Sequence, residues 1–354
     1  MPVHIHHIET CVPSFRHSQE YVTEQFCAIT EDERTRRLIK AGNRRSGIDF
    51  RHSVCEGLVN QPPFDEKGQA TTAARNKVYA LESRKLAVEV GGNVIANTPG
   101  VEKEDITHVI YTSCTGFANP GPDFYLVKDL GLKETVERTV IGFMGCYAAF
   151  PTLRMARSIC LADPDAVVLA VCLELSSIHM QVDGNIDNIR GNAVFADGTA
   201  AAIVSAKSPE GGTPGYTLEN FATATIPGSE DDMAWTIGDA GFELVLSSYV
   251  PGVIEAEVSG IFERLSIDPG TVDQWAVHPG GKSILDKVEK AMGFPPEVLA
   301  VSREILRNYG NMSSSTILFV LKELLKTAKD NDNTAALAFG PGLTVETALL
   351  KVRL

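Results

Sequence analysis

The chain repeats one pattern of apolar segments in its two halves, at an offset of about 165 residues. In each half a strand-like run precedes a glycine and a polar residue that open a long apolar run, and a further strand-like run follows. The matched segments are 108–114, 145–146 and 167–171 in the first half and 274–278, 310–311 and 335–339 in the second. Self-similarity on this scale indicates a duplicated domain and not a short-repeat solenoid.

Strand-like and helix-like patterns alternate along the chain, which is typical of α/β proteins with mostly buried parallel strands. Helical patterns cover 77–97, 147–161, 250–265 and 316–329. The run 147–161 is apolar almost all round, so this helix should be buried. The turn-rich stretch 207–215 predicts a boundary between an N-terminal half at 1–206 and a C-terminal half at 207–354.

Three residues at the matched positions carry the groups needed for covalent thioester chemistry. Cys146 and Asn311 open the two equivalent apolar runs, and His278 ends a strand-like run before a Pro-Gly-Gly turn. A thiolate attacks, an imidazole stabilises it, and a carboxamide donates to a developing oxyanion. The start of a helix and an adjacent imidazolium would both lower the pKa of the Cys146 thiol. The duplication would bring the three together, so we predict an acyl-transferring enzyme.

Each member of this trio also has a structural interpretation. A cysteine in an apolar run can be a packed core residue, which is what we expect of Cys160 and Cys172. A histidine before two glycines can belong to a turn, and Asn311 alone could be a helix N-cap. Papain-like peptidases use the same three residue types. A Cys-His-Asn hydrolase of that kind is a distant alternative, because a peptidase gives no reason for the duplication.

The composition narrows the choice of partners and compartment. The formal net charge of -13 argues against nucleic acid or an anionic membrane as the main partner. The sequence contains no run of 18 consecutive apolar residues, so we expect no membrane span. The N-terminus does not resemble a signal peptide. The 7 cysteines all lie in the first half, without metal-ligand spacing, which predicts a reduced, cytoplasmic setting and no metal site.

Four segments carry motifs in a characteristic order, at 112–116, 275–286, 309–315 and 338–347. Together they resemble the type III polyketide synthases, the chalcone synthase-like branch of the thiolase superfamily. The resemblance extends from about Ser113 to the C-terminus. It implies a thiolase-like fold, in which two duplicated βαβαβ halves form a layered αβαβα architecture, and a homodimer.

The same resemblance implies roles for individual residues. Cys146 would be the nucleophile, and His278 and Asn311 would drive malonyl decarboxylation and hold the enolate oxygen. Phe195 would gate the tunnel between the CoA arm and the cavity, although core packing also explains a phenylalanine there. Leu244 matches a second gate that is phenylalanine in the family. The remaining residues expected to line the cavity are Cys114, Asn119, His179, Phe339, Gly340, Pro341 and Gly342.

Basic residues crowd one stretch of this acidic chain, at Arg34, Arg36, Arg37, Lys40, Arg44, Arg45 and Arg51. Members of the family bind CoA phosphates at a basic mouth, and phosphates are well recognised by such charges. We expect Arg45 and Arg51 to contact these phosphates. A solvated helix face explains any one of these cations equally well.

The expected reaction uses an acyl-CoA starter and malonyl-CoA, with no metal or organic cofactor. Repeated decarboxylative condensation on Cys146 would be followed by cyclisation to a pyrone, a resorcinol or another phenolic product. A ketoacyl-ACP synthase III-like single condensation is the closest alternative, on the same fold with the same trio. The Gly-Pro-Gly loop at 340–342 favours the polyketide branch. Cys114 and Leu244 suggest an apolar cavity and hence a fatty acyl starter, while aromatic starters stay open.

Overall fold

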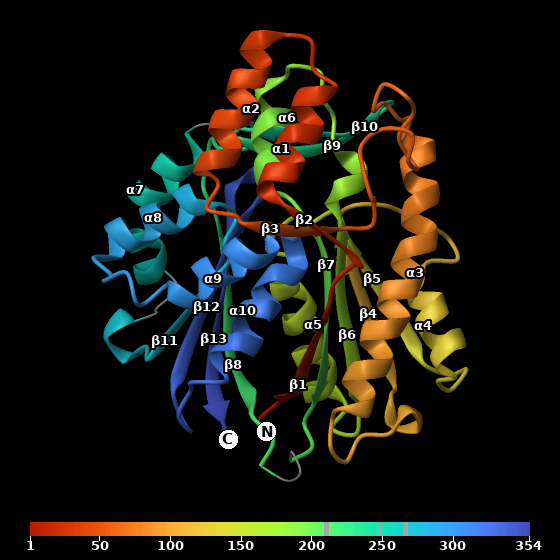
Figure 1. The fold of residues 1–354 in the computed structure, drawn as a ribbon. Coiled ribbons are helices and arrows are strands. Elements are labelled where there is room, and N and C mark those ends of the chain that lie inside the picture. The colour runs from red at the N-terminus through yellow and green to blue at the C-terminus, as the bar shows by residue number, and fades with distance from the viewer. Residues whose placement is uncertain (209–211, 248, 265–267) are drawn as a thin grey trace.

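Within residues 1–208, 212–247, 249–264 and 268–354, which the computed structural model describes, nine strands form one mixed sheet (Figure 1). The strands of the first half are β1 (His4–Cys11), β4 (His108–Ser113), β5 (Glu137–Gly142), β6 (Val167–Leu175) and β7 (Asp197–Ser205). Those of the second half are β8 (Gly215–Thr225), β11 (Gln274–Val277), β12 (Asn333–Gly340) and β13 (Thr344–Arg353). Their order across the sheet is β11-β12-β13-β8-β1-β7-β6-β4-β5.

The two halves of this sheet have the same strand order, which confirms the predicted duplication. The order β1-β7-β6-β4 in the first half corresponds to β8-β13-β12-β11 in the second, and β5 extends the first half at the sheet edge. The halves join where β1 pairs antiparallel with β8, with His4 opposite Thr217 and Ile5 opposite Tyr216. The duplication therefore gives one sheet with related halves on either side of this junction.

The prediction of mostly parallel strands is wrong. β4 pairs in parallel with β5 and β6, and β11 pairs in parallel with β12. The remaining neighbours in the described sheet are antiparallel. The connection from β12 to β13 consists of the short turn Pro341–Leu343, and a connection this short can join only antiparallel strands.

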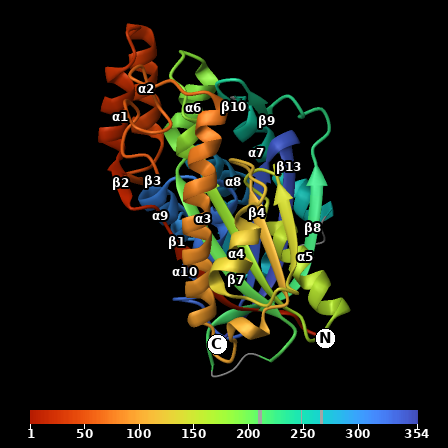
Figure 2. The same ribbon diagram turned by 90° about the vertical axis from the view of Figure 1, so that its right-hand side faces the viewer.

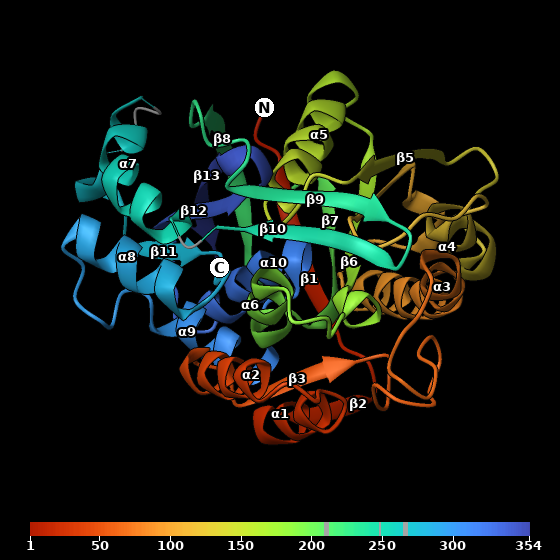
Figure 3. The ribbon, with the colours of Figure 1, turned by 90° about the horizontal axis from the view of Figure 1, so that it is seen from above.

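Three apolar clusters divide the helices into layers. The central cluster combines α5 (Ala149–Ala162) and α10 (Thr316–Leu324) with strands of both halves. A second cluster packs α3 (Thr72–Ala96) and α4 (Pro122–Leu130) on the outer face of the first half-sheet, where α3 runs along the length of the sheet (Figure 2). A third packs α7 (Val250–Arg264), α8 (Lys282–Met292) and α9 (Ala300–Tyr309) on the second half-sheet. Seen from above, α5 and α10 lie between these outer groups, which confirms the αβαβα architecture (Figure 3).

The central helices differ in detail from the sequence prediction. α5 begins at Ala149 and is not buried all round, since Met155 and Leu161 are exposed on its outer side. α10 ends at Leu324, and a turn follows where the helix was predicted to continue to residue 329. The predicted boundary at 207–215 and the predicted end of the helix at 265 lie partly outside the described residues.

A small lobe lies at the end of the sheet that is opposite the two termini (Figure 1). It contains β2 (Phe15–Ser18), α1 (Gln19–Ala28), α2 (Glu33–Arg45) and β3 (Phe50–Ser53), with α6 (Ile186–Val194) and the hairpin of β9 (Met233–Gly238) and β10 (Gly241–Leu246) beside it. Residues of α2, α6 and β10 line the same cavity as Cys146 and Asn311, so the lobe covers the turns that precede α5 and α10. Among the described helices, none is long and apolar enough to cross a membrane.

Candidate active site

Cys146 lies in a tight turn immediately before α5. Gly145 precedes it with a φ of +82°, a conformation that residues with a Cβ atom rarely adopt. A Cβ at this position would also lie 2.2 Å from Cδ of Pro341, so no side chain fits between the turn and the loop after β12. The turn is held from below by Cys114, whose sulfur accepts a hydrogen bond from the Gly145 N–H at 2.9 Å. The turn consequently places Cys146 beside the cavity, where the residue as a whole is half-buried.

Asn311 occupies the equivalent position before α10, and its carboxamide is fixed on both sides. Its Oδ1 accepts a hydrogen bond from the Ser313 N–H at 2.8 Å. Its Nδ2 donates to the Gly280 carbonyl at 3.1 Å and lies 4.0 Å from Sγ of Cys146. Because an amide nitrogen carries two hydrogens, one N–H is engaged by Gly280 and the other is directed toward the thiol.

His278 directly follows β11, and its backbone N–H donates to the Leu337 carbonyl at 2.8 Å. The side chain is 2% exposed, and neither ring nitrogen has a hydrogen-bond partner among the described residues. The ring faces the same cavity as Cys146 and Asn311. The structure thus brings together the three side chains that the sequence predicted to cooperate.

That cavity has a volume of about 430 Å³. Its apolar wall is formed by Val194, Phe195, Met233, Leu244, Leu246 and Phe339. The two predicted gates both pack against Gly191, because a Cβ there would lie 2.5 Å from Leu244 and 3.5 Å from Phe195. Among the described residues, no group of three or more His, Cys, Asp or Glu side chains is arranged to hold a metal ion.

Burial opposes charge on both reactive groups. It raises the pKa of the Cys146 thiol to about 11, with the nearby carboxyl of Glu174 acting in the same direction and hydrogen bonds from Ser313 and Asn311 against it. Burial also lowers the pKa of His278 to about 3. The lowered thiol pKa expected from the helix start is therefore not found, because desolvation outweighs it. At neutral pH the resting pair is a thiol beside a neutral imidazole.

Three cations, Arg45, Arg190 and Lys282, line the cavity, and Arg45 and Lys282 are exposed to solvent at its opening. Lys282 pairs with Asp286 at 2.6 Å, and Arg190 pairs with Asp187 at 2.9 Å. Arg45 is exposed at the end of α2, and in the described part of the chain no ion pair engages it. It is thus the cation of this group that is most available to an incoming anion.

Seven of the predicted site residues do not line this cavity in the described structure, namely Arg51, Asn119, Cys114, His179, Gly340, Pro341 and Gly342. Arg51 is 2% exposed and lies behind Phe195, so it cannot meet a phosphate at the opening. Asn119 is exposed in the loop before α4. Cys114 is buried beneath the Cys146 turn. His179 borders a separate void of about 20 Å³, next to Leu244.

His179 has a structural role in this position. Its Nε2–H donates to the Thr115 carbonyl at 2.7 Å, and its Nδ1 accepts from the Phe242 N–H at 3.2 Å. Burial lowers its pKa to about 3, so the ring stays neutral in this tautomer. It ties the β9–β10 hairpin to the loop after β4 and supports Leu244 indirectly.

Gly340 and Pro341 form the support behind the nucleophile. A Cβ on Gly340 would lie 2.5 Å from the ring of Tyr147, and Pro341 packs on Gly145. Phe339, one residue earlier, reaches the cavity wall. The loop therefore acts on the site mainly by fixing the turn that holds Cys146.

Glu174 is a site residue that the sequence analysis missed. It is fully buried at the end of β6 and accepts hydrogen bonds from the Cys114 N–H at 2.9 Å, Thr115 Oγ1 at 3.0 Å and Ser314 Oγ at 2.5 Å. Burial raises its pKa to about 7. A glutamate inside the apolar run of β6 is unusual, since such side chains are seldom fully buried, and this signal could have identified it.

Comparisons with known proteins agree with this geometry. Residues 2–208 match the family model described as chalcone and stilbene synthases, N-terminal domain, and residues 217–353 match the corresponding C-terminal domain. Among solved structures, the C-terminal type III polyketide synthase domain of Steely1, a type I/III hybrid from Dictyostelium, is 27% identical, with a TM-score of 0.91 and 100% of both chains covered. PKS-I from the brown alga Ectocarpus siliculosus is 29% identical with the same TM-score, over 99% of this chain and 98% of that one.

The neutral resting pair leads to a prediction about the reactivity of Cys146. In a His278→Ala variant the thiol has no proton acceptor beside it, so alkylation by iodoacetamide should rise about tenfold per pH unit between pH 7 and 10. In the wild type the imidazole can take the proton, and we expect alkylation at pH 7 at least about tenfold faster than in the variant. The rate is followed by mass spectrometry of the Cys146 peptide. Identical profiles for the two proteins would show that His278 does not activate the thiol.

Proposed function

Because the chain belongs to the chalcone and stilbene synthase family, whose members are acyltransferases with a Cys-His-Asn triad, we propose that Cys146, His278 and Asn311 extend an acyl-CoA starter with malonyl-CoA. The observation that carries this proposal is the shared cavity. A thiol, an imidazole and a fixed carboxamide line one mainly apolar cavity of about 430 Å³. The two halves of the duplicated fold each supply part of this set.

The first step is transfer of the starter to Cys146. The thiol gives its proton to the imidazole of His278, and the sulfur attacks the thioester carbonyl of the acyl-CoA. The resulting thiolate and imidazolium carry no net charge together, so their attraction offsets the desolvation that opposes either charge alone. Collapse of the tetrahedral intermediate expels the CoA thiolate, which takes up the proton, and leaves the acyl group on Cys146.

The second step is decarboxylation of malonyl-CoA. Carbon dioxide leaves from the malonyl group, and its bonding electrons form an enolate whose oxygen needs hydrogen-bond donors. Nδ2 of Asn311 and an N–H of the neutral His278 ring are the donors available at this place. Asn311 is already oriented by Ser313 and Gly280, so little reorganisation is needed when the negative charge develops.

The third step is condensation. The enolate carbon attacks the acyl thioester, the Cys146 sulfur leaves, and a chain longer by two carbons remains attached to CoA. Reloading of this chain onto Cys146 allows further cycles. We propose that the cavity holds the growing chain until it cyclises to a pyrone, a resorcinol or another phenolic product.

The composition of the cavity wall favours a fatty acyl starter. Met233, Leu244, Leu246 and Phe339 present apolar side chains to the space beyond the catalytic groups. Cys114 no longer supports this choice, since it lies beneath the turn. Aromatic starters are a second possibility, because an apolar pocket discriminates between similar groups by a binding free energy of only about 1–3 kcal/mol per methylene.

Single condensation, as in ketoacyl-ACP synthase III-like enzymes, is the alternative on the same fold. Product masses from malonyl-CoA and a panel of starters distinguish the two, since one extension adds a single two-carbon unit and iteration adds several. The relative from Dictyostelium is described as a type III polyketide synthase domain, which favours iteration here.

We further propose a homodimer and a cytoplasmic location. β5 forms an edge of the described sheet, with Val140 55% exposed on it and Phe117 46% exposed nearby. An exposed edge strand with apolar side chains suits pairing with a second copy. All seven cysteines are free thiols, which suits a reducing compartment.

Loading and decarboxylation should separate in Asn311→Ala. The variant should still acquire one acyl group at Cys146, because the amide is not needed for thiol attack. Release of carbon dioxide from malonyl-CoA should fall by about 100- to 1000-fold, the usual effect of removing one oxyanion donor. Cys146→Ala is the matched control, which should lose acylation. Intact protein mass and carbon dioxide release measure the two steps, and near-normal release from Asn311→Ala would refute the assigned role.

Arg45→Ala tests the opening of the cavity. If Arg45 pairs with a CoA phosphate, KM for malonyl-CoA should rise about tenfold while kcat changes little, because uniform binding is lost. Arg37→Ala on the exposed face of the same helix should leave KM unchanged. Steady-state kinetics at low and high salt provide the measurement. An unchanged KM in Arg45→Ala would show that Arg45 lies on a solvated helix face and does not bind a CoA phosphate.

Leu244→Trp tests whether the cavity sets the product. The larger ring should fill space beside Phe195, so products should shift to shorter starters or fewer extensions, while a short acyl-CoA still acylates Cys146. Val245→Trp is the control, because the neighbouring side chain on a strand points to the opposite face. Chromatography with mass detection gives the product profile. A normally folded Leu244→Trp enzyme with unaltered products would show that Leu244 does not limit the chain.

A further inference from the structure

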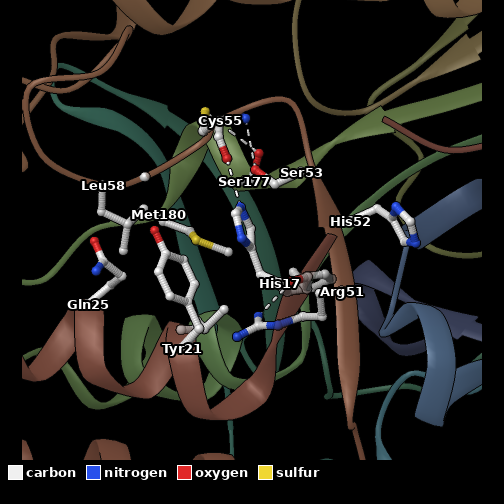
Figure 4. Close-up of a pocket in the computed structure, with 13 residues that line it drawn as sticks. His17, Tyr21, Gln25, Arg51, His52, Ser53, Cys55, Leu58, Ser177 and Met180 are labelled. Atoms are coloured by element: carbon white, nitrogen blue, oxygen red, sulfur yellow. Dashed lines mark hydrogen bonds between the residues drawn. The ribbon is translucent and has the colours of Figure 1, made fainter. Parts of the chain in front are cut away.

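Arg51 is buried behind the cavity wall and holds the backbone at the end of α6. It lies on β3 and borders a pocket of about 30 Å³ with His17, Ser53 and Ser177, which is too small for a CoA phosphate (Figure 4). Its Nη1 donates to the Asn192 carbonyl at 2.6 Å and to the Phe195 carbonyl at 2.8 Å. A single guanidinium nitrogen thus binds both ends of the four-residue segment that ends in the gate.

The electrostatics of the helix end explain why a cation is placed there. The last carbonyls of a helix have no partner within it, and the helix dipole makes this end negative. Phe195 is the C-cap of α6, so the carbonyls of Asn192 and Phe195 belong to this end. The buried guanidinium of Arg51 neutralises the negative end of α6, where solvent is excluded.

Asp197 supplies the opposite charge two residues after the gate. It is fully buried and accepts hydrogen bonds from the N–H groups of Ser177 and Val54 at 2.7 and 2.8 Å. Burial is the main cause that lowers the pKa of Arg51, to about 10, and the charge of Asp197 acts against it. Arg51 therefore stays protonated at neutral pH. The chain from Asn192 to Asp197 is held by a cation and an anion in the interior.

The same segment is paired with Asn311 on its other side. The Asn311 N–H donates to the Val194 carbonyl at 2.8 Å, and the Ala196 N–H donates to the Asn311 carbonyl at 2.9 Å. These two bonds form an isolated bridge between Phe195 and Asn311. Gly310 lies against Arg51 and Ala196, since a Cβ on it would be 3.1 Å from Cγ of Arg51 and 3.1 Å from Cβ of Ala196. Arg51, Phe195 and Asn311 thus form one connected unit from three distant parts of the sequence.

We propose that Arg51 is a positioning residue that sets Phe195 at the cavity wall and, through the Val194–Ala196 segment, the Asn311 amide beside Cys146. Its effect on catalysis is indirect, because it touches neither substrate nor reacting atoms. Loss of its two hydrogen bonds releases the end of α6, and the bridge to Asn311 shifts with it. Decarboxylation depends on the placement of the Asn311 amide, whereas acylation of Cys146 does not. The inference rests on the proposed function, which assigns these two steps.

The test compares Arg51→Met and Arg51→Lys with Arg84→Met, which changes a partly exposed arginine on α3 that pairs with Asp129. Acylation of Cys146 by a starter acyl-CoA is measured by protein mass, and carbon dioxide release from malonyl-CoA is measured with kcat and KM separated. For Arg51→Met we expect kcat for decarboxylation to fall about 10- to 100-fold, the usual cost of a misplaced catalytic group. KM and the acylation rate should change by less than about threefold.

Arg51→Lys should recover part of the lost decarboxylation, because an ammonium can reach one of the two carbonyls. Arg84→Met should behave as the wild type. A parallel fall of acylation and decarboxylation in Arg51→Met would indicate a general structural role and overturn the proposal, as would unchanged rates in both steps.

If Arg51→Met does not fold, Arg51→Lys decides alone. A larger loss of decarboxylation than of acylation supports the positioning role, and equal losses contradict it. A wild-type enzyme that neither acylates Cys146 nor releases carbon dioxide would overturn the proposed function. Normal wild-type rates with equal losses in the variants would overturn only the role of Arg51.

Discussion

The contact between the Cys146 turn and the loop after β12 is the constraint on which the site depends. A Cβ on Gly145 would lie 2.2 Å from Pro341, and a Cβ on Gly340 would lie 2.5 Å from Tyr147. The backbones of the two halves can approach this closely only because both positions are glycine. This approach brings the thiol of the first half within 4.0 Å of the Asn311 amide from the second.

Among the described residues, backbone pairing between strands or bridge residues joins the two halves at two separate places. β1 pairs with β8 near the termini, and the Phe195–Asn311 bridge joins the halves at the site. Between these places α5 and α10 fill the space, in one apolar cluster with strands of both half-sheets. At the catalytic end this bridge acts together with the contact of Pro341 on Gly145 and with the hydrogen bond from Ser314 to Glu174. The buried Arg51 stabilises the segment that forms this bridge, because hydrogen bonds from a charged donor are stronger than those between neutral groups.

Burial controls the chemistry as much as it controls the fold. Desolvation keeps Cys146, His278 and His179 neutral at pH 7 and raises the pKa of Glu174 to about 7. An isolated charge is costly in this interior, but a thiolate and an imidazolium formed together cancel. Such a site favours charge only when it develops in pairs or against fixed donors. The fixed Asn311 amide and the unpartnered His278 ring are suited to that requirement.

The sequence by itself determined the duplicated α/β fold and the trio of Cys146, His278 and Asn311, because apolar periodicity and residue chemistry recur at matched positions in both halves. The layered αβαβα architecture followed from the resemblance of its motifs to a known family. The surroundings of the trio were decided only by the tertiary structure. Arg51 belongs to a basic run in the sequence, yet β3 turns its side chain into the interior. The packing of distant segments likewise decides the strand directions, the burial of Glu174 and the direction in which the pKa of Cys146 shifts. A local sequence pattern cannot predict these properties, because it does not determine which distant segments pack together.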